Sequence, residues 1–264
     1  MLQSIRPVLS YGAHSHGRPL TREQRPGSGM LIVVSEQYPA LAGLHDIDWR
    51  NLQHAYGSAE DVPELLTSLA AGDDSVLWDL CGNIYHQGTV YQATSYAVPF
   101  LWRLLAAQGD AGHSGVASLL GTIAEAACDP PSPWSQKILD EIWNGAPVAL
   151  QLLQSSNETA RRGAVCILAC LPEKAKELTT PLQDVLRRKD CSQHERALVG
   201  LALAALGVFD EAAFGSGTAP FIVEAKHLAQ QAAMGDLEAI GTCRLILPEA
   251  VEVDPEDLSN WPRT

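Results

Sequence analysis

The chain has 264 residues, of which 46% are hydrophobic and 6% aromatic, so it is long enough to bury a sizeable core. Few aromatic residues, with plentiful Ala and Leu, favour helices over sheets. The formal net charge is −13. Residues 1–30 carry four Arg against one Glu, whereas residues 31–264 carry fourteen basic against thirty acidic side chains, a net charge of −16. Such an acidic body argues against binding a nucleic acid backbone, which needs clustered Lys and Arg, and it suits a basic protein partner.

The sequence indicates neither a membrane segment nor a secretory signal. No run approaches the roughly 18 apolar residues of a membrane helix, and no apolar segment follows the N-terminal charges. The six cysteines include no CxxC pair, and they are interpreted as small buried hydrophobic residues in a reducing compartment, the cytoplasm. Cys166 and Cys170 lie one helical turn apart, but no nearby His or second pair completes a metal site. No metal and no cofactor are therefore expected.

The N-terminal segment lacks hydrophobic periodicity and is rich in Gly, Pro, Ser, Arg and His, which predicts a disordered or weakly ordered stretch over residues 1–43. Asp46 or Asp48 is then expected to cap a short helix that ends at Gly57. The apolar face of this helix is formed by Trp49, Leu52 and Tyr56.

Two amphipathic helices follow, joined by a tight acidic turn. The first begins after Asp61, has Pro63 in its first turn and ends at Gly72. The second is expected to be capped by residues 73–75 and to carry Leu77, Leu80, Cys81, Ile84 and Tyr85 on one face. Together they predict a helical hairpin.

The same pattern recurs along the chain. Prolines at intervals of 34 to 48 residues are predicted to open the first helix of each unit: Pro63, Pro99, Pro147, Pro181 and Pro220. Asn157 and Ser192 are predicted caps of second helices, Asp236 begins the last helix, and an extra helix is expected around Ile138 and Ile142. A repeat of this length is the signature of an all-α fold, an α-solenoid of about five helical hairpins over residues 44–247, with an acidic tail at 248–264.

The repeated helices resemble those of the HEAT-repeat family in its bacterial form. The resemblance rests on the first-helix pattern Val-Pro-x-Leu-Leu and on second helices of the form Asn157…Arg161…Ala164…Leu168 and Ser192…Arg196…Leu201. The stretches HAYGSAEDVPELL and YHQGTVYQATSYAVPFL further resemble a group of bacterial HEAT-like proteins of largely unassigned role. The repeat resemblance covers roughly residues 58–247, and it implies an architecture and adaptor-type protein binding rather than a particular chemistry.

One polar and aromatic connector, residues 85–94, has no counterpart elsewhere in the chain. Its imidazole, amide, hydroxyl and phenol groups suit hydrogen-bonded recognition of a partner or ligand. The candidate binding residues are His86, Gln87, Thr89, Tyr91 and Thr94, with His54 and Tyr56 included if the fold brings them near. The structural alternative is that His86 and Gln87 cap the preceding helix and that Tyr91 fills the space between two hairpins. No catalytic residues are nominated, because the sequence holds no nucleophile motif, P-loop or GxGxxG.

Three functions remain open at this point. The leading one is a non-enzymatic protein-binding scaffold or adaptor, of immunity type toward a basic partner in its most specific form. The second is an enzyme or cofactor-handling protein, because the alkylpurine DNA glycosylases and the bilin lyases also resemble HEAT solenoids. The glycosylases require a basic channel, which an acidic body does not provide. The third is a structural subunit of a larger assembly.

Overall fold

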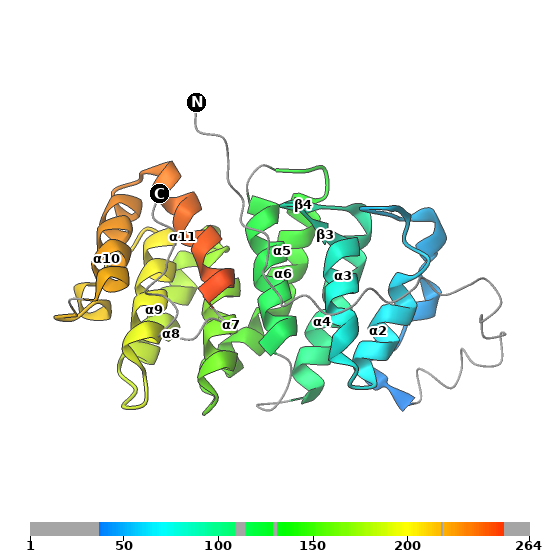
Figure 1. Ribbon diagram of the computed structural model, residues 1–264, viewed down its shortest axis with the longest axis horizontal. Coiled ribbons are helices and arrows are strands. Elements are labelled where there is room, and N and C mark those ends of the chain that lie inside the picture. The colour runs from blue at the N-terminus through cyan, green and yellow to red at the C-terminus, as the bar shows by residue number, and fades with distance from the viewer. Residues whose placement is uncertain (1–36, 109–113, 129–130, 218, 251–264) are drawn as a thin grey trace.

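The computed structural model describes residues 37–108, 114–128, 131–217 and 219–250, and these residues are predominantly helical (Figure 1). The prediction of an all-α fold is confirmed. The α-helices are α2 (Val62–Ala70), α3 (Leu77–Ile84), α4 (Gln92–Gln108), α5 (Ser114–Cys128), α6 (Ser135–Leu152), α7 (Glu158–Ala169), α8 (Ala175–Leu186), α9 (Gln193–Ala205), α10 (Pro220–Ala233) and α11 (Leu237–Ala250). Two antiparallel hairpins pair β1 (Gln53–His54) with β2 (Gly57–Ser58) and β3 (Tyr85–His86) with β4 (Thr89–Val90). In the parts of the chain that the structure describes, no helix is both long and apolar enough to cross a membrane.

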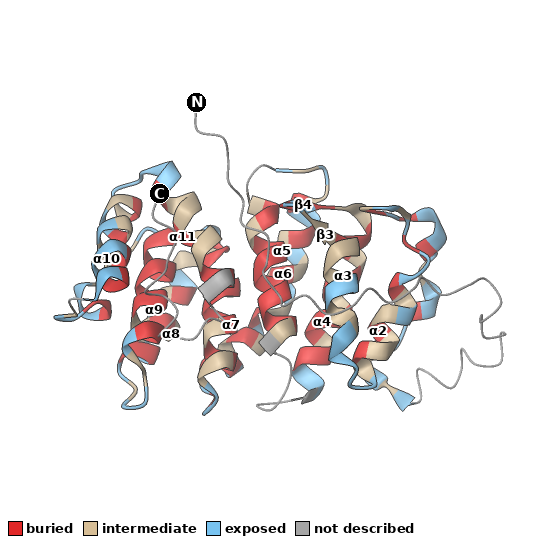
Figure 2. Cartoon of the chain, in the orientation of Figure 1, coloured by how far each residue is buried: buried red, intermediate tan, exposed pale blue. Residues whose placement is uncertain are grey.

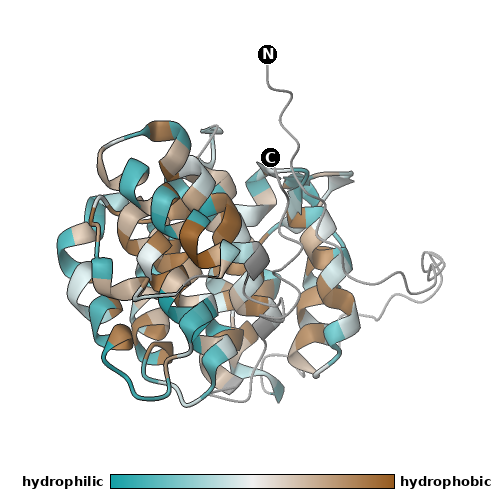
Figure 3. Ribbon diagram, turned by 60° about the vertical axis from the view of Figure 1, so that its left-hand side comes forward, coloured by the Kyte–Doolittle hydropathy of each residue, from teal (hydrophilic) through white to brown (hydrophobic). Residues whose placement is uncertain are grey.

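The helices stand side by side in chain order, so that the molecule is an elongated row (Figure 1). Helix α4 packs on α6, α5 packs on α7, and α7 packs on α9, while α10 covers α9 from the other side. Buried residues line the helix faces along this row (Figure 2). Turns at its lower edge are hydrophilic (Figure 3). Neighbouring helices thus bury faces that a single amphipathic hairpin would leave exposed to water.

Helix α11 does not simply extend the row. It contacts α5, α7 and α9 as well as α10, and in Figure 1 it lies in front of α7 and α9. Its buried stripe is Ala239, Cys243 and Leu247, which follow one another at intervals of four residues. Because α9 is enclosed by α8, α10 and α11, its residues are buried almost all round.

Helix starts follow the predicted capping residues in the C-terminal half. The Asn157 side chain accepts hydrogen bonds from the backbone N–H groups of Thr159 (2.9 Å) and Ala160 (3.3 Å). Ser192 accepts one from Glu195 (3.1 Å), and Asp236 caps α11 in the same way. These bonds satisfy N–H groups that have no partner within the helix.

Three of the five prolines do not open helices, contrary to the prediction. Pro63 and Pro220 lie in the first turns of α2 and α10, whereas Pro99, Pro147 and Pro181 lie inside α4, α6 and α8. Helix α6 therefore joins the predicted extra helix to the one expected after Pro147. An interior proline removes one hydrogen bond from the helix, and the packing of these long helices outweighs that loss.

The predicted short helix after Asp48 is also wrong. The chain forms a 3-10 turn over Trp49–Asn51 and then the β1–β2 hairpin, which places Tyr56 on an exposed turn rather than on an apolar face. Trp49 is buried, and its indole N–H donates to the Leu44 carbonyl (2.8 Å). Leu41, in a preceding 3-10 turn, is buried as well. Residues 1–36 and 251–264, which include most of the predicted flexible segment and acidic tail, lie outside the described residues.

A buried ion pair joins α7 to α9. The Arg161 guanidinium donates to both carboxylate oxygens of Glu195, at 2.6 and 2.8 Å, and also to the Ser155 carbonyl at 2.8 Å. Side chains of the pair are 1% and 0% exposed. The hydrogen bond to Glu195 raises the pKa of Arg161 above its usual value, so the guanidinium stays charged. Two of the polar residues of the predicted repeats are thus committed to holding helices together.

Candidate functional site

The two β-hairpins lie beside each other at the ends of α2 and α3. The backbone N–H of Ala55, in the β1–β2 turn, donates to the carbonyl of Asn83 near the end of α3 (2.9 Å). The side chain of Asn83 in turn donates to Asp61, just before α2 (2.8 Å). The connector predicted from residues 85–94 is therefore a hairpin, and the fold brings the segment around His54 and Tyr56 to it.

His54 anchors the first hairpin. Its Nδ1 accepts the backbone N–H of Tyr56 (2.9 Å), so its Nε2 carries the proton that is donated to Asp61 (3.0 Å). The His54 side chain is 5% exposed, whereas that of Asp61 is 50% exposed. The Asp61 side chain accepts hydrogen bonds from His54 and Asn83, and it makes no capping hydrogen bond to the start of α2. His54 is consequently a support that fixes Tyr56 rather than a group available to a ligand.

The exposed Tyr56 and the half-buried His86 contact each other at the surface of the site. Tyr56 is 68% exposed, and its hydroxyl lies 3.2 Å from Nδ1 of His86. The two rings meet edge to face with centroids 5.3 Å apart. Burial and then the neighbouring Tyr56 phenol raise the pKa of Tyr91, which keeps its hydroxyl neutral and able to donate.

The turn of the second hairpin has an unusual backbone. Gln87 has φ of 48° and Gly88 has φ of 76°, as in the two-residue turns that match the twist of paired strands. Glycine adopts this conformation freely, but a side chain at Gln87 is strained by about 1–2 kcal/mol. The exposed Gln87 and Thr89 side chains project from this tip. Strain retained at an exposed position is typical of functional loops.

Thr94 secures the base of the same hairpin. Its hydroxyl donates to the Ile84 carbonyl at the end of α3 (2.5 Å) and accepts the backbone N–H of Tyr91 (2.8 Å). The residue is fully buried. Thr94 therefore joins α3 to α4 and, like His54, supports the site from beneath.

The structure thus separates the seven predicted residues into two groups. Exposed or half-buried groups gather on one surface, which we term the hairpin surface: Tyr56, His86, Gln87, Thr89 and Tyr91. His54 and Thr94 lie below it. Sequence reasoning missed the part played here by Asp61 and Asn83. In the sequence, Asp61 is indistinguishable from an ordinary helix cap, and Asn83 from an ordinary polar residue on a helix surface.

Exposed carboxylates are numerous in the part of the chain that carries the hairpin surface. Residues 37–108 contain eight carboxylates, and every one is exposed: Asp46, Asp48, Glu60, Asp61, Glu64, Asp73, Asp74 and Asp79. Only Arg50 and Arg103 oppose them. Arg50 lies 3.5 Å from Glu60, and Arg103 donates to the Ala42 carbonyl (2.8 Å). This half of the molecule therefore attracts cations and repels anions.

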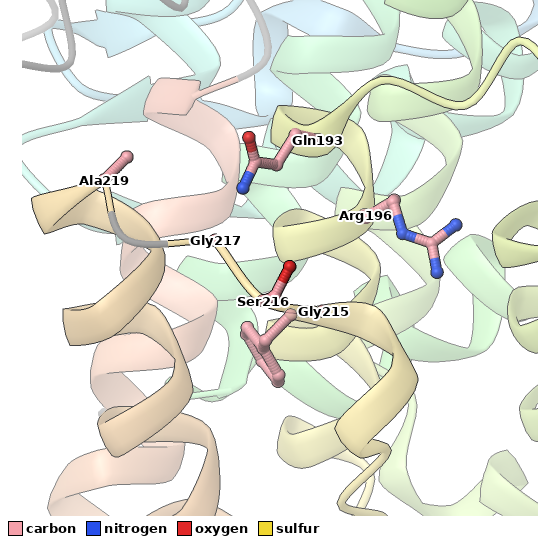
Figure 4. A pocket seen from close by; sticks show the side chains of 7 residues that line it. Gln193, Arg196, Gly215, Ser216, Gly217 and Ala219 are labelled. Atoms are coloured by element: carbon pink, nitrogen blue, oxygen red, sulfur yellow. The ribbon is translucent and has the colours of Figure 1, made fainter.

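A large open pocket lies at the other end of the row, between α9 and the glycine-containing connection before α10 (Figure 4). It encloses about 640 Å³, and Gln193, Arg196 and Ser216 contribute its polar groups. The Arg196 guanidinium donates to the backbone carbonyls of Leu186 and Ala212, both at 2.6 Å. Arg196 thus holds α9 to the end of α8 before it and to the turn at Glu211–Ala213 after it, and the described lining of the pocket includes no second Lys or Arg for an anionic ligand.

The predicted burial of the six cysteines holds for three of them, whereas Cys81, Cys128 and Cys191 are half-buried. Cys166, Cys170 and Cys243 are buried, and burial raises the pKa of Cys81 to about 11 and of Cys243 to about 12. Such thiols are protonated near neutral pH and weakly nucleophilic. Within the described residues, no group of three or more His, Cys, Asp and Glu side chains is arranged to hold a metal ion.

Comparison of the chain with protein-family models, with curated proteins and with solved structures gave no match. The assignment of a function consequently rests on the geometry and charge of the surfaces described above.

Proposed function

We propose that the protein is a non-enzymatic binding module, built on HEAT-like repeats, whose hairpin surface binds a basic protein. The observation that carries this proposal is the occurrence of the exposed Tyr56, with His86 and Tyr91 beside it, in a part of the chain with a large excess of exposed carboxylates over basic groups. Tyr56, His86 and Tyr91 form a small aromatic surface, and residues 37–108, to which they belong, carry eight exposed carboxylates against two arginines that are engaged within the chain.

The chemistry of that surface favours Arg and Lys side chains of the partner. The exposed face of Tyr56 suits a cation–π contact, and the nearby carboxylates steer a basic protein toward it. Residues Gln87 and Thr89 add hydrogen-bonding groups at the tip of the second hairpin. An immunity-type role, in which the acidic module neutralises a basic toxin in the cytoplasm, is the most specific form of this proposal.

The position of helix α11 limits which surfaces of the molecule are open to a partner protein. In a stack of helical hairpins one long face is a natural binding surface, but here α11 covers part of it by packing on α5, α7 and α9. Binding at the hairpin surface needs no displacement of α11. The same acidic residues disfavour the DNA glycosylase-like alternative, because a DNA backbone requires clustered basic groups.

The proposal is tested by affinity purification from the cells that produce the protein, followed by mass spectrometry. Wild type is compared with a Tyr56→Ala/His86→Ala variant and with a matched control, Val223→Ala/His227→Ala, which removes an exposed apolar and an exposed imidazole side chain from α10. We expect a stoichiometric basic partner that is retained by the control and lost by the hairpin variant.

Binding of the recovered partner is then measured at about 50 and about 300 mM salt, because screening at the higher ionic strength weakens exposed charge pairs. An affinity that falls at least about tenfold supports the proposal. Equal capture by the hairpin variant, or an affinity independent of salt, overturns it. Melting temperatures of the three proteins show whether a loss of binding reflects unfolding.

A further inference from the structure

A second concave feature lies between α3 and α5 and has no part in the hairpin surface. This α3–α5 groove encloses about 230 Å³, with walls formed by Leu77, Trp78, Cys81 and Leu119. Trp78 is 51% exposed, which is unusual for so large an apolar side chain. The groove is therefore an accessible apolar depression on the surface.

Small residues on α5 keep the groove open. At Gly115 the helices approach so closely that an added Cβ would lie 2.3 Å from Cδ2 of Leu77. The buried Ser118 and Thr122 line the groove one and two turns further along α5. Thr122 donates its hydroxyl to the Ser118 carbonyl (3.0 Å), so its polar atom is satisfied within its own helix. The floor therefore accepts an apolar group without leaving that hydroxyl unpaired.

The rim of the groove is negatively charged. Asp74 contributes to the lining, and the exposed Asp73 precedes it in sequence. The sequence contains no Lys or Arg between Arg50 and Arg103, and α5 contains none either. An apolar depression whose one charged lining residue is a carboxylate is complementary to an apolar side chain flanked by basic residues.

We propose that the α3–α5 groove is the anchor pocket for a basic peptide segment of the partner protein. One branched aliphatic or aromatic side chain enters between Trp78 and Leu119, and flanking Lys or Arg residues face Asp74 and its neighbours. The volume fits a single large side chain rather than a drug-sized ligand. Aromatic walls around one inserted side chain are typical of the few contacts that dominate a protein interface.

The position of the groove links it to the hairpin surface. The first turns of α3 line the groove, and the last residue of α3, Ile84, is followed directly by β3. The eight residues of α3 span about 12 Å, a length covered by about four residues of an extended chain. The inference rests on the proposed function in that both require a basic partner, but the groove adds the requirement for an apolar anchor.

The test uses the full chain and three fluorescein-labelled peptides: Arg-Arg-Leu-Arg-Arg, Arg-Arg-Ala-Arg-Arg and Glu-Glu-Leu-Glu-Glu. Fluorescence anisotropy gives their affinities for wild type, Trp78→Ala and Asp74→Asn. Leu237→Ala and Glu224→Gln are matched controls at exposed positions on α11 and α10. Both groove substitutions are at exposed positions, so they leave the buried core intact.

We expect the leucine peptide to bind at least about tenfold more tightly than the alanine peptide, as for a side chain worth about 1.4 kcal/mol. Trp78→Ala should reduce this ratio to within about twofold, and Asp74→Asn should weaken both basic peptides by about twofold to threefold. Neither control should change the ratio. A bound leucine peptide should also slow alkylation of Cys81 at about pH 9, read by mass spectrometry.

Any of these outcomes would overturn the inference: equal affinity for the leucine and alanine peptides, equal binding of the acidic peptide, or unchanged Cys81 alkylation. A further outcome is that wild type binds none of the peptides and that Trp78→Ala changes the oligomeric state of the protein. This outcome would show that a second copy of the chain occupies the groove, and it would also overturn the inference. A different result would refute the proposed function itself. That result is that affinity purification recovers no basic partner whose binding depends on salt and on Tyr56 and His86.

Discussion

The assignment of Thr94 to a supporting role gives the sharpest stability prediction. Replacement by valine keeps the shape of the buried side chain but removes a hydroxyl that bonds the Ile84 carbonyl and the Tyr91 N–H. A buried group that loses its partner costs about 1–3 kcal/mol. Because Tyr91 is only half-buried and water can reach part of the site, we expect a total loss of about 3 kcal/mol for Thr94→Val.

This loss is measured by urea unfolding followed by far-UV circular dichroism. For a chain of this size it should also lower the melting temperature by roughly 6–12 °C. Thr94→Ser retains the hydroxyl and should recover most of the stability. Thr89→Val, on the exposed strand of the same hairpin, should change stability by less than about 0.5 kcal/mol. If Thr94→Val is as stable as wild type but no longer binds the partner, Thr94 belongs to the binding surface and the assignment is wrong.

Four further predictions concern other parts of the fold. Glu195→Ala should lower the free energy of unfolding by about 3–5 kcal/mol, because it leaves Arg161 buried without its counterion, and chemical unfolding measures this. Gln87→Gly should raise stability by about 0.5–1 kcal/mol in the same assay by relieving the left-handed backbone, and a decrease would show that the side chain makes a compensating contact. The hydrogen bond from Arg188 lowers the pKa of Asp190. The stability that this carboxylate contributes is therefore fully present above its unfolded pKa, near 4, and is lost as the pH falls through its lower folded pKa. Asp190→Asn should accordingly make the free energy of unfolding depend less on pH in that acid range. Leu247→Ala should cost about 2–5 kcal/mol by leaving a cavity where α11 crosses the other helices, and an unchanged melting temperature would contradict that packing.

The helices were predictable because their signals are local. Asn157 and Ser192 cap helices where their sequence contexts indicate, since a cap depends only on the next three residues. Proline signals failed at Pro99 and Pro147 because a helix interior tolerates proline when packing on both sides compensates for the missing hydrogen bond. That compensation depends on neighbours distant in sequence.

The candidate site was only partly predictable for a related reason. The connector stood out by composition, and the Gln87-Gly88 pair between β-forming residues was an available hairpin signal. The proximity of Tyr56 to His86 follows instead from contacts across thirty residues of chain, made through Asp61 and Asn83. No periodicity within a single helix carries that information.

The crossing of α11 over the row of helices has a consequence for synthesis of the chain. A linear stack can reach its final stability unit by unit as it leaves the ribosome. Here the faces of α5, α7 and α9 that receive α11 remain uncovered until residues 237–250 emerge, because α11 follows all three helices in the sequence. A nascent chain that stops short of this helix exposes apolar surface along several units at once, and its protection from aggregation then falls to chaperones. Synthesis through α11 is therefore needed before these faces of α5, α7 and α9 are covered.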